Sequence, residues 1–191
     1  MERDKAKVSR GPRSDAARNR ERLIEAATRV FGTGRPQASL EAIAREAGLG
    51  IGTLYRHFPT REALFEAVYR REVDHLGDLA EQLAQQAAPV EALRQWLHAH
   101  VRLAATKRGM IEALQLAAFR SDLKAYSFER LSAALAQLLD RGVMSGDLRP
   151  DISADDLLRT LVGVFYTDGA GDWQAAALRI VDVFVDGLRQ R

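Results

Sequence analysis

The sequence contains no cysteine, which excludes a disulfide framework, a zinc site with cysteine ligands and a cysteine nucleophile. It also lacks any apolar run that approaches 18 residues, and residues 1–22 are charged rather than apolar. Neither a transmembrane helix nor a secretory signal is therefore expected. These absences predict a cytoplasmic protein whose 191 residues are enough to form a core without covalent staples.

Lysine is also scarce, because 24 of the 28 basic residues are arginine, a bias typical of a GC-rich genome. The placement of charge is more informative than its composition. Residues 1–60 carry 12 basic and 7 acidic side chains, a net charge of +5, whereas residues 61–191 carry 16 and 19, a net charge of −3. A basic N-terminal part on a mildly acidic remainder suggests a polyanionic partner for the former.

Helical periodicity runs through almost the whole chain, and no convincing strand pattern interrupts it. Glycine and proline divide the pattern into segments, so the predicted fold class is all-α with about nine helices. The helices are expected at about residues 18–31, 40–47, 51–57, 61–85, 89–107, 109–119, 121–142, 153–167 and 173–189. Residues 1–17 mix basic and small polar side chains and are expected to form a flexible arm.

The second and third segments have the spacing of a helix-turn-helix unit. Ala44 supplies a small residue where two short helices cross, and Gly48 supplies a residue that tolerates positive φ in the turn. Leu54, six residues after Gly48, is placed to pack the second helix against Ile43 and Ala47. The second helix of such a unit enters the major groove of DNA.

The residues that follow strengthen this reading. The run from Gly52 to Phe58 (GTLYRHF), then Thr60-Arg61-Glu62 and Leu64-Phe65, resembles the N-terminal domain of the TetR family of bacterial transcriptional repressors. The likeness covers about residues 20–69. It implies a helix-turn-helix domain over residues 18–65 and a ligand-binding and dimerisation domain over residues 66–191, with no enzymatic activity and no cofactor.

The resemblance also implies roles for individual residues. Gly50, Ile51, Gly52 and Thr53 would open the recognition helix, with its backbone close to the groove and Ile51 offered to a thymine methyl. The remaining candidates would contact phosphates. Arg56 could instead reach a base edge, and the arginines of the first helix and the arm could instead enter the minor groove. These remaining candidates are Ser39, Tyr55, Arg56, His57, Arg61, Arg18 and Arg20, together with Arg10 and Arg13 of the arm.

Some of these residues have a plainer interpretation. Leu54 and Phe58 are expected in the core, and Tyr55 is equally suited to the core or to a phosphate contact, because a tyrosine can bury its ring and extend its hydroxyl. The run Gly48 to Gly52 superficially resembles a dinucleotide-binding loop. No strand precedes it and its spacing differs, so that interpretation is set aside.

The resemblance places the ligand among the helices expected between residues 89 and 167. The candidate lining residues are Trp96, His100, Met110, Leu114, Phe119 and Tyr126, although residues of this kind at helical spacing more often belong to the core. The last two helices would form a four-helix interface with a second subunit in a homodimer. The candidate interface residues are Val162, Phe165, Tyr166, Ile180, Val181, Phe184 and Leu188, about half of them expected in the protomer's own core.

The sequence shows no metal site, since His98 and His100 lie two residues apart and face different sides of a helix. No nucleophile elbow, phosphate loop or His-Glu-x-x-His motif supports an enzyme. We therefore expect a nucleoid-associated repressor that leaves a pseudo-palindromic operator when a small molecule displaces the helix beginning at Arg61. Two alternatives stay open: activation instead of repression, and a helical small-molecule carrier or partner-binding protein that does not bind DNA selectively.

Overall fold

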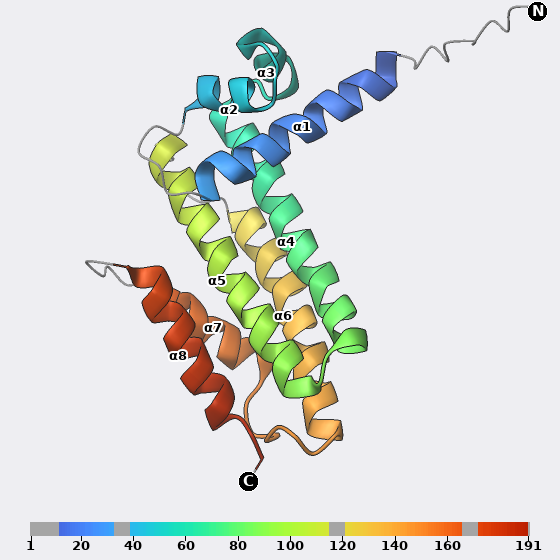
Figure 1. Ribbon diagram of the computed structural model, residues 1–191, viewed down its shortest axis with the longest axis vertical. Helices are drawn as coiled ribbons and strands as arrows, with labels where there is room; N and C mark the ends of the chain where they lie inside the picture. Colours follow the sequence, from blue (N-terminus) through green and yellow to red (C-terminus); the bar gives the residue numbers. More distant parts are fainter. Residues whose placement is uncertain (1–11, 33–38, 115–120, 166–171, 191) are drawn as a thin grey trace, which may run out of the picture.

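The computed structural model describes residues 12–32, 39–114, 121–165 and 172–190 (Figure 1). Over these ranges the chain forms helices joined by turns and loops, with one isolated bridge between Leu148 and Arg189, which confirms the all-α class. The helices are α1 (Pro12–Gly32), α2 (Leu40–Glu46), α3 (Ile51–His57), α4 (Arg61–Gln86), α5 (Pro89–Leu114), α6 (Ser121–Met144), α7 (Ala154–Phe165) and α8 (Trp173–Gly187). None of these helices is long and apolar enough to cross a membrane.

The helices form an N-terminal head (α1–α3) at one end of an elongated body (α4–α8), as Figure 1 shows. Helix α4 starts in the head and continues down the body, where it packs against both α5 and α6. Helix α8 covers α5, and α7 packs against α6. Helix α4 therefore runs without a break from the head to the far end of the body, and α5 returns along it to contact α1.

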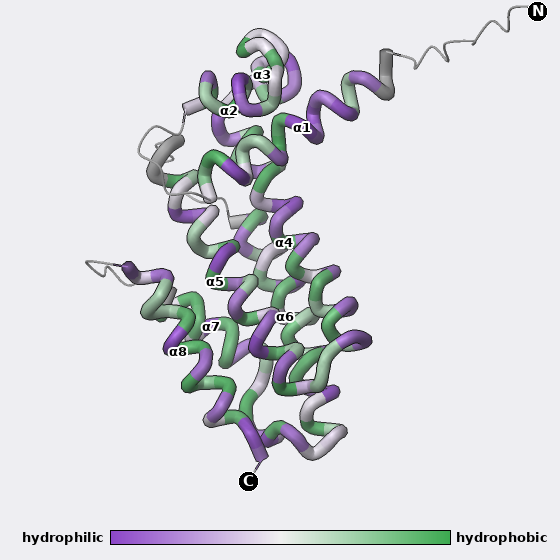
Figure 2. The backbone as a smooth tube through the Cα atoms, viewed as in Figure 1, coloured by the Kyte–Doolittle hydropathy of each residue, from purple (hydrophilic) through white to green (hydrophobic). Residues whose placement is uncertain are grey.

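Hydrophobic side chains on one face of each body helix build the core. Figure 2 shows hydrophobic and hydrophilic residues alternating within the turns of α4, α5 and α6, which is the pattern of helices with one buried side. In α4, buried Leu64, Val68 and Val73 lie on the side that faces the other helices. The core is continuous from the head to the body, because Leu23 and Leu54 of the head belong to the same buried cluster as Leu135 of α6.

The helix-turn-helix unit forms as the residue pattern predicts. Ser39 caps α2, its hydroxyl oxygen accepting a hydrogen bond from the Ala42 amide at 3.1 Å. Gly48 adopts φ +63°, and the amides of Gly48 and Leu49 donate to the carbonyls of Arg45 and Ala44 at 2.9 and 2.8 Å. These two bonds are a Schellman motif, which ends α2 and turns the chain toward α3.

The first helix begins earlier than the sequence suggested. The expected arm covered residues 1–17, but α1 starts at Pro12, so residues 12–17 are helical. Proline is favoured in the first turn, where its missing N–H costs nothing, and Asp15 lies where the helix dipole favours an acid. Residues 1–11, including Arg10, and the side chain of Arg13 lie outside the described part of the chain.

The two helices expected at 89–107 and 109–119 are instead one helix, α5, over Pro89–Leu114, which gives eight helices in the described ranges. Gly109 does not end the helix, because it keeps an ordinary helical φ; positive φ occurs among the described glycines at Gly48 and Gly146. Its role is a close approach of two helices. A Cβ at this position would lie 2.7 Å from the carbonyl oxygen of Phe31, at the end of α1.

Replacing Gly109 with alanine should destabilise the protein by about 1–3 kcal/mol, because the Phe31 carbonyl is backbone and cannot yield without moving α1. Gly77→Ala in α4 is the matched control. The three atoms nearest to a Cβ there, the first at 2.5 Å, all belong to the guanidinium of Arg130, which is the mobile end of a side chain. That change should alter stability by less than about 1 kcal/mol. Urea unfolding measures both, and equal effects would show that the α1–α5 contact imposes no constraint.

Candidate DNA-binding surface and ligand cavity

Helix α3 presents its predicted recognition residues at the surface of the head. Ile51 is 36% exposed and Tyr55 is 48% exposed, high fractions for large apolar and aromatic side chains. Gly50 and Gly52 are also exposed, and a Cβ at either would meet nothing within 4 Å. The backbone at the start of α3 is thus open to a close partner. Leu54 and Phe58, at 1% and 2% exposure, lie in the core as expected.

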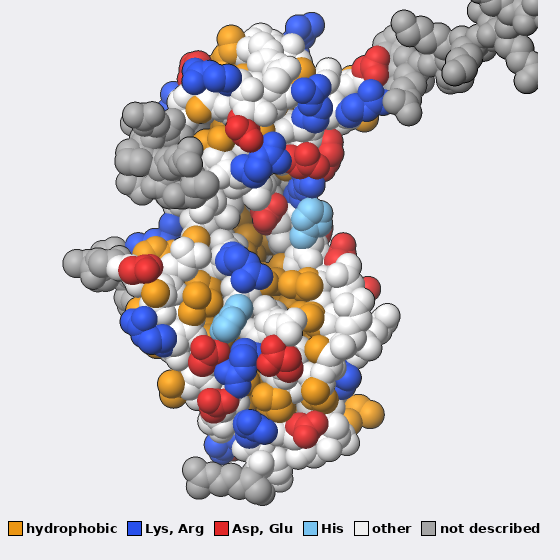
Figure 3. Space-filling model, viewed as in Figure 1, with side chains coloured by type: hydrophobic (Ala, Val, Ile, Leu, Met, Phe, Trp, Pro, Cys, Tyr) orange, Lys and Arg blue, Asp and Glu red, His pale blue; other side chains and the backbone are white. Residues whose placement is uncertain are grey.

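Basic side chains surround this surface. Arg56 is exposed and bonded within α3, its Nε donating to the Gly52 carbonyl and its Nη2 to the Thr53 hydroxyl, both at 3.3 Å. The Arg20 guanidinium lies 5.1 Å from the centre of the Phe58 ring, and Arg18 makes an exposed 3.4 Å pair with Asp15. Figure 3 shows basic side chains over this end of the molecule with acidic ones among them.

Arg61 has a position that helix stability alone does not explain. It is the first residue of α4, directly after the Thr60 cap, and it is exposed. A positive charge in the first turn opposes the helix dipole, which favours anions there. An arginine beside free helix N–H groups is, however, a good arrangement for a phosphate. Ser39 and His57 are partly buried at the edges of the same surface.

A cavity of about 700 Å³ lies in the body, between α4, α5, α6 and α7. This is the region in which the resemblance places the ligand. Its described lining consists of Tyr69, His100, Leu103, Ala104, Lys107, Ile111, Lys124, Ala125, Ser127, Phe128, Leu131, Leu158 and Val162. A mostly apolar lining with a few polar groups is typical of a small-molecule site.

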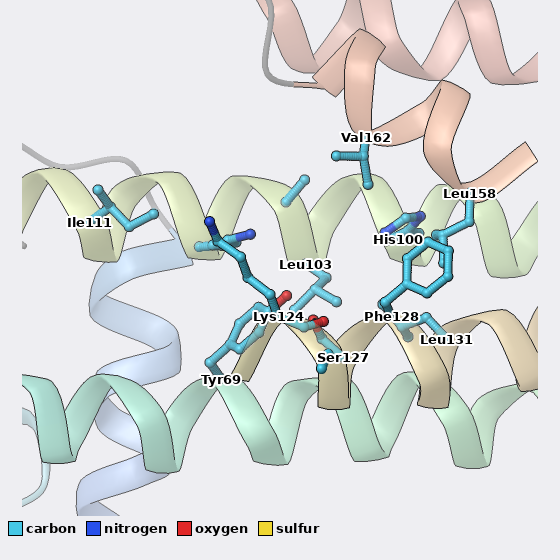
Figure 4. A pocket seen from close by; sticks show the side chains of 13 residues that line it. Tyr69, His100, Leu103, Ile111, Lys124, Ser127, Phe128, Leu131, Leu158 and Val162 are labelled. Atoms are coloured by element: carbon cyan, nitrogen blue, oxygen red, sulfur yellow. The ribbon is translucent and has the colours of Figure 1, made fainter. Parts of the chain in front are cut away.

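The lysines and Tyr69 lie toward one end of this cavity. Figure 4 shows Tyr69 and Lys124 toward the end marked by Ile111, and Phe128, Leu158 and Val162 toward the other. The Lys107 ammonium lies 5.3 Å from the centre of the Tyr69 ring. Burial and the nearby charge of Lys124 lower the pKa of Lys107 to about 8, so it remains mostly protonated at pH 7. Burial raises the pKa of Tyr69, which therefore stays neutral.

Of the six residues predicted to line the pocket, His100 lies in the cavity wall. Trp96 and Met110 are fully buried in the core, and the Trp96 indole donates to the Leu76 carbonyl at 2.8 Å. Tyr126 lies between α4 and α6, where its hydroxyl donates to Asp74. The side chain of Leu114 and all of Phe119 lie outside the described part of the chain.

His100 is the polar group at the apolar end of the cavity. It is 5% exposed, and its ring centre lies 5.6 Å from that of Trp96. Burial, and secondarily the charge of Lys107, lower the pKa of His100 to about 4. The imidazole is therefore neutral at physiological pH and could serve a ligand as a hydrogen-bonding group rather than as a cation.

This shift predicts a pH dependence of stability. The unfolded chain binds a proton at His100 below pH 6.5, whereas the folded chain binds it only below about pH 4. The free energy of unfolding is therefore unaffected by this residue above pH 6.5 and decreases as the pH falls from 6.5 to about 4. Between pH 7 and 5 the loss from this site should be about 2 kcal/mol. His100→Leu should remove that loss, and His75→Leu, at an exposed position of α4, should not. Urea unfolding at the two pH values tests this; identical pH effects in all three proteins would contradict it.

The predicted dimer surface divides into exposed and buried residues. On α8, Ile180 is 43% exposed and Phe184 is partly buried, and on α7 Val162 is 42% exposed. Val181 and Leu188, in contrast, are buried in the protomer's own core at 0% and 5% exposure. The side chain of Phe165 and all of Tyr166 lie outside the described residues.

Val183, which was not among the predicted interface residues, lies at the centre of this surface. Val183 is 74% exposed and lines grooves on the outer face of α8 together with Ile180 and Phe184. Ala176, Ile180, Val183, Phe184 and Gly187 follow helical spacing and form the α8 outer stripe. A stripe of exposed apolar side chains marks a surface that a protein partner covers.

Helix α4 makes contacts with both the head and the cavity over a few residues. Tyr69 lines the cavity and stacks on Phe65 with ring centres 5.8 Å apart. Two residues later, Arg71 pairs with Glu21 of α1 at 2.5 Å, and the Thr28 hydroxyl of α1 donates to Glu72 at 3.1 Å. A displacement of Tyr69 would therefore act directly on α1.

These features define a DNA-binding protein with a helix-turn-helix head and a helical body that encloses a cavity. Residues 23–68 match the family model described as bacterial regulatory proteins of the tetR family, and residues 88–190 match that of the C-terminal domain of SbtR-like transcriptional regulators. The chain therefore belongs to the TetR family of transcriptional regulators. This family consists of transcription factors and not enzymes, and the described residues contain no cluster suited to a metal ion.

Solved structures agree with this assignment over nearly the whole chain. A TetR transcriptional regulator from Streptomyces coelicolor is 40% identical, with a TM-score of 0.73 over 90% of this chain and 98% of that one. A TetR regulator from Mycobacterium vanbaalenii is 32% identical, with a TM-score of 0.71 over 94% and 99%.

Curated proteins are similar to this chain over a shorter stretch. An HTH-type transcriptional regulator of Staphylococcus aureus is 43% identical over 63 residues, which are 32% of this chain and 34% of that protein. The chain thus matches about a third of the length of these curated relatives.

Proposed function

We propose that the protein is a homodimeric repressor that binds a pseudo-palindromic operator through α3 and leaves it when a small molecule occupies the cavity. The observation that carries this proposal is the position of α4. Within four residues this helix lines the cavity with Tyr69 and holds α1 through Arg71 and Glu72. A ligand that moves the cavity wall therefore moves the head.

On the DNA side, the exposed face of α3 inserts into the major groove. Ile51 contacts a thymine methyl, while Tyr55, His57 and Arg61 hold phosphates on either side. Because Gly50, Ile51 and Gly52 have no long polar side chains, each half-site provides modest sequence discrimination. Two half-sites in a symmetric dimer multiply that discrimination, and they must be about 34–36 Å apart to face successive major grooves.

The α8 outer stripe supplies the dimer contact, together with the exposed part of α7. An interface between two copies of the same stripe is isologous, so the two heads are related by a twofold axis as a palindromic operator requires. The body helices hold the two heads at a fixed separation in the absence of ligand. Displacement of α4 changes this separation and lowers operator affinity by a coupling typically of about 1–3 kcal/mol.

Gel retardation of DNA from upstream of the protein's own gene tests the proposal, carried out at several salt concentrations and with an unrelated fragment of equal length. A repressor binds the upstream fragment selectively, and its affinity falls steeply with salt because phosphate contacts release counterions. Equal retardation of both fragments, or none, would instead favour a helical carrier or partner-binding protein. A footprint of two symmetric half-sites is expected where binding is selective.

A further inference from the structure

The distribution of lysine in this chain points to the chemistry of the ligand. Residues 8–191 contain two lysines, Lys107 and Lys124, and every other Lys or Arg position in that range is arginine. Both lysines line the same cavity, and no arginine is among its described lining residues. The two come from different helices, α5 and α6, so their meeting is a property of the fold and not of a local charge run.

The cavity has a gradient of polarity along α5. From His100 to Ile111 its wall follows about 16 Å of helix at 1.5 Å per residue. Phe128, Leu131, Leu158 and Val162 make the His100 end apolar. Lys124 and the Tyr69 ring stand toward the Ile111 end, and Lys107 lies one helical turn before Ile111 in α5. The described lining of the cavity includes no acidic residue.

Two ammonium groups beside one cavity are unfavourable for each other. Each repels the other, and burial of Lys107 removes part of its hydration. An anion placed between them reverses both effects, because it supplies the opposite charge and accepts hydrogen bonds from the lysines. A cationic ligand group would add to the repulsion. Lysine suits this position better than arginine, because its compact ammonium on a flexible stem can turn toward a small anion.

We infer that the cavity binds an amphipathic small molecule with an anionic head group, held between Lys107 and Lys124, and an apolar body that lies along Phe128, Leu131 and Leu158. This inference rests on the proposed function in one respect only, that the cavity is the effector site. Carboxylates and phosphate monoesters share the required chemistry. The volume of about 700 Å³ suits a molecule of ordinary metabolite or drug size.

Four probes with one tail and different head groups test the inference: decanoate, decyl phosphate, decan-1-ol and decyltrimethylammonium. The affinity of each probe is measured by its displacement of the neutral fluorophore N-phenyl-1-naphthylamine from the full-length protein. Each probe is used below its critical micelle concentration. We expect at least one anion to bind at least tenfold more tightly than the alcohol, and the cation to bind most weakly. The tighter of the two anions identifies the head group.

The double variant Lys107→Gln/Lys124→Gln should abolish the preference for the anion while leaving the affinity for decan-1-ol within about twofold. The matched control is Arg70→Gln/Arg130→Gln, which removes the same charge from α4 and α6. Those arginines lie outside the described cavity lining, Arg70 over the Tyr126 ring and Arg130 paired with Asp78. The control should keep the full preference.

Three results would overturn the inference: an alcohol that binds as tightly as both anions, a preference that survives in the lysine variant, or no binding of any probe. Gel retardation of operator DNA by wild type and both double variants, each without ligand, distinguishes a wrong ligand class from a wrong DNA-binding role. Selective retardation by wild type and both variants would leave the DNA-binding role intact while the ligand class was wrong. Its loss in all three would reject the DNA-binding role itself.

Discussion

Leu54→Ala and Tyr55→Ala, neighbouring substitutions in α3, should have opposite effects on stability and on DNA binding. Leu54 is 1% exposed and joins α3 to the core of the head, so its truncation leaves a cavity and costs about 2–5 kcal/mol of unfolding free energy. Tyr55 is 48% exposed, and its removal should change stability by less than about 1 kcal/mol.

The DNA affinity of the Tyr55 variant should nevertheless fall. Loss of a phosphate hydrogen bond costs about 1–1.5 kcal/mol, roughly tenfold per half-site and about a hundredfold for a dimer on two half-sites. Operator and unrelated DNA should be affected alike, since a phosphate contact carries no sequence information. Urea unfolding and gel retardation of the purified variants measure the two quantities. A Tyr55→Ala protein that keeps its DNA affinity, or that shows an altered base preference, would mean that the side chain is not a phosphate contact.

Val183→Glu should dissociate the dimer. Val183 is 74% exposed in the protomer, so the substitution leaves folding unaffected, but in an interface it buries an unpaired charge from each subunit. Such a charge costs about 3–5 kcal/mol, which raises the dimer dissociation constant by at least about a hundredfold. Operator affinity should fall with it, because a single head reads one half-site.

Met144→Glu provides the control for this change. Met144 is the described large apolar residue with the highest exposure, 88%, and it ends α6 outside the α8 outer stripe. Analytical ultracentrifugation of the two variants should show a monomer for Val183→Glu and an unchanged dimer for Met144→Glu. A Val183→Glu protein that remains dimeric would place the interface elsewhere on the molecule.

The head could be predicted from the sequence because its signals are local. The Ser39 cap, the left-handed Gly48 and buried Leu54 all lie within sixteen residues and each acts on a neighbouring turn. The continuity of α5 was missed for the opposite reason. Gly109 resembles a helix terminus in sequence. Glycine is required there because the Phe31 carbonyl leaves no room for a Cβ, and these two residues are 78 positions apart.

The region of the cavity was predicted from the family resemblance, but most of its lining residues could not be, because its walls come from four helices. Trp96, Met110 and Tyr126 have the same apolar or amphipathic character as true lining residues, and only packing decides which side of a helix meets the space. Lys107 and Lys124 did leave a signal, as isolated lysines in a chain that otherwise uses arginine. The signal has a meaning only when the fold shows that both face one cavity.

Coupling of the cavity to the operator through α4 is measured most directly by operator affinity with and without saturating decanoate. We expect decanoate to weaken operator binding by about 5- to 150-fold and, by thermodynamic reciprocity, operator DNA to weaken decanoate binding by the same factor. An operator affinity that is unchanged while the cavity is demonstrably filled would show that the two sites are not coupled.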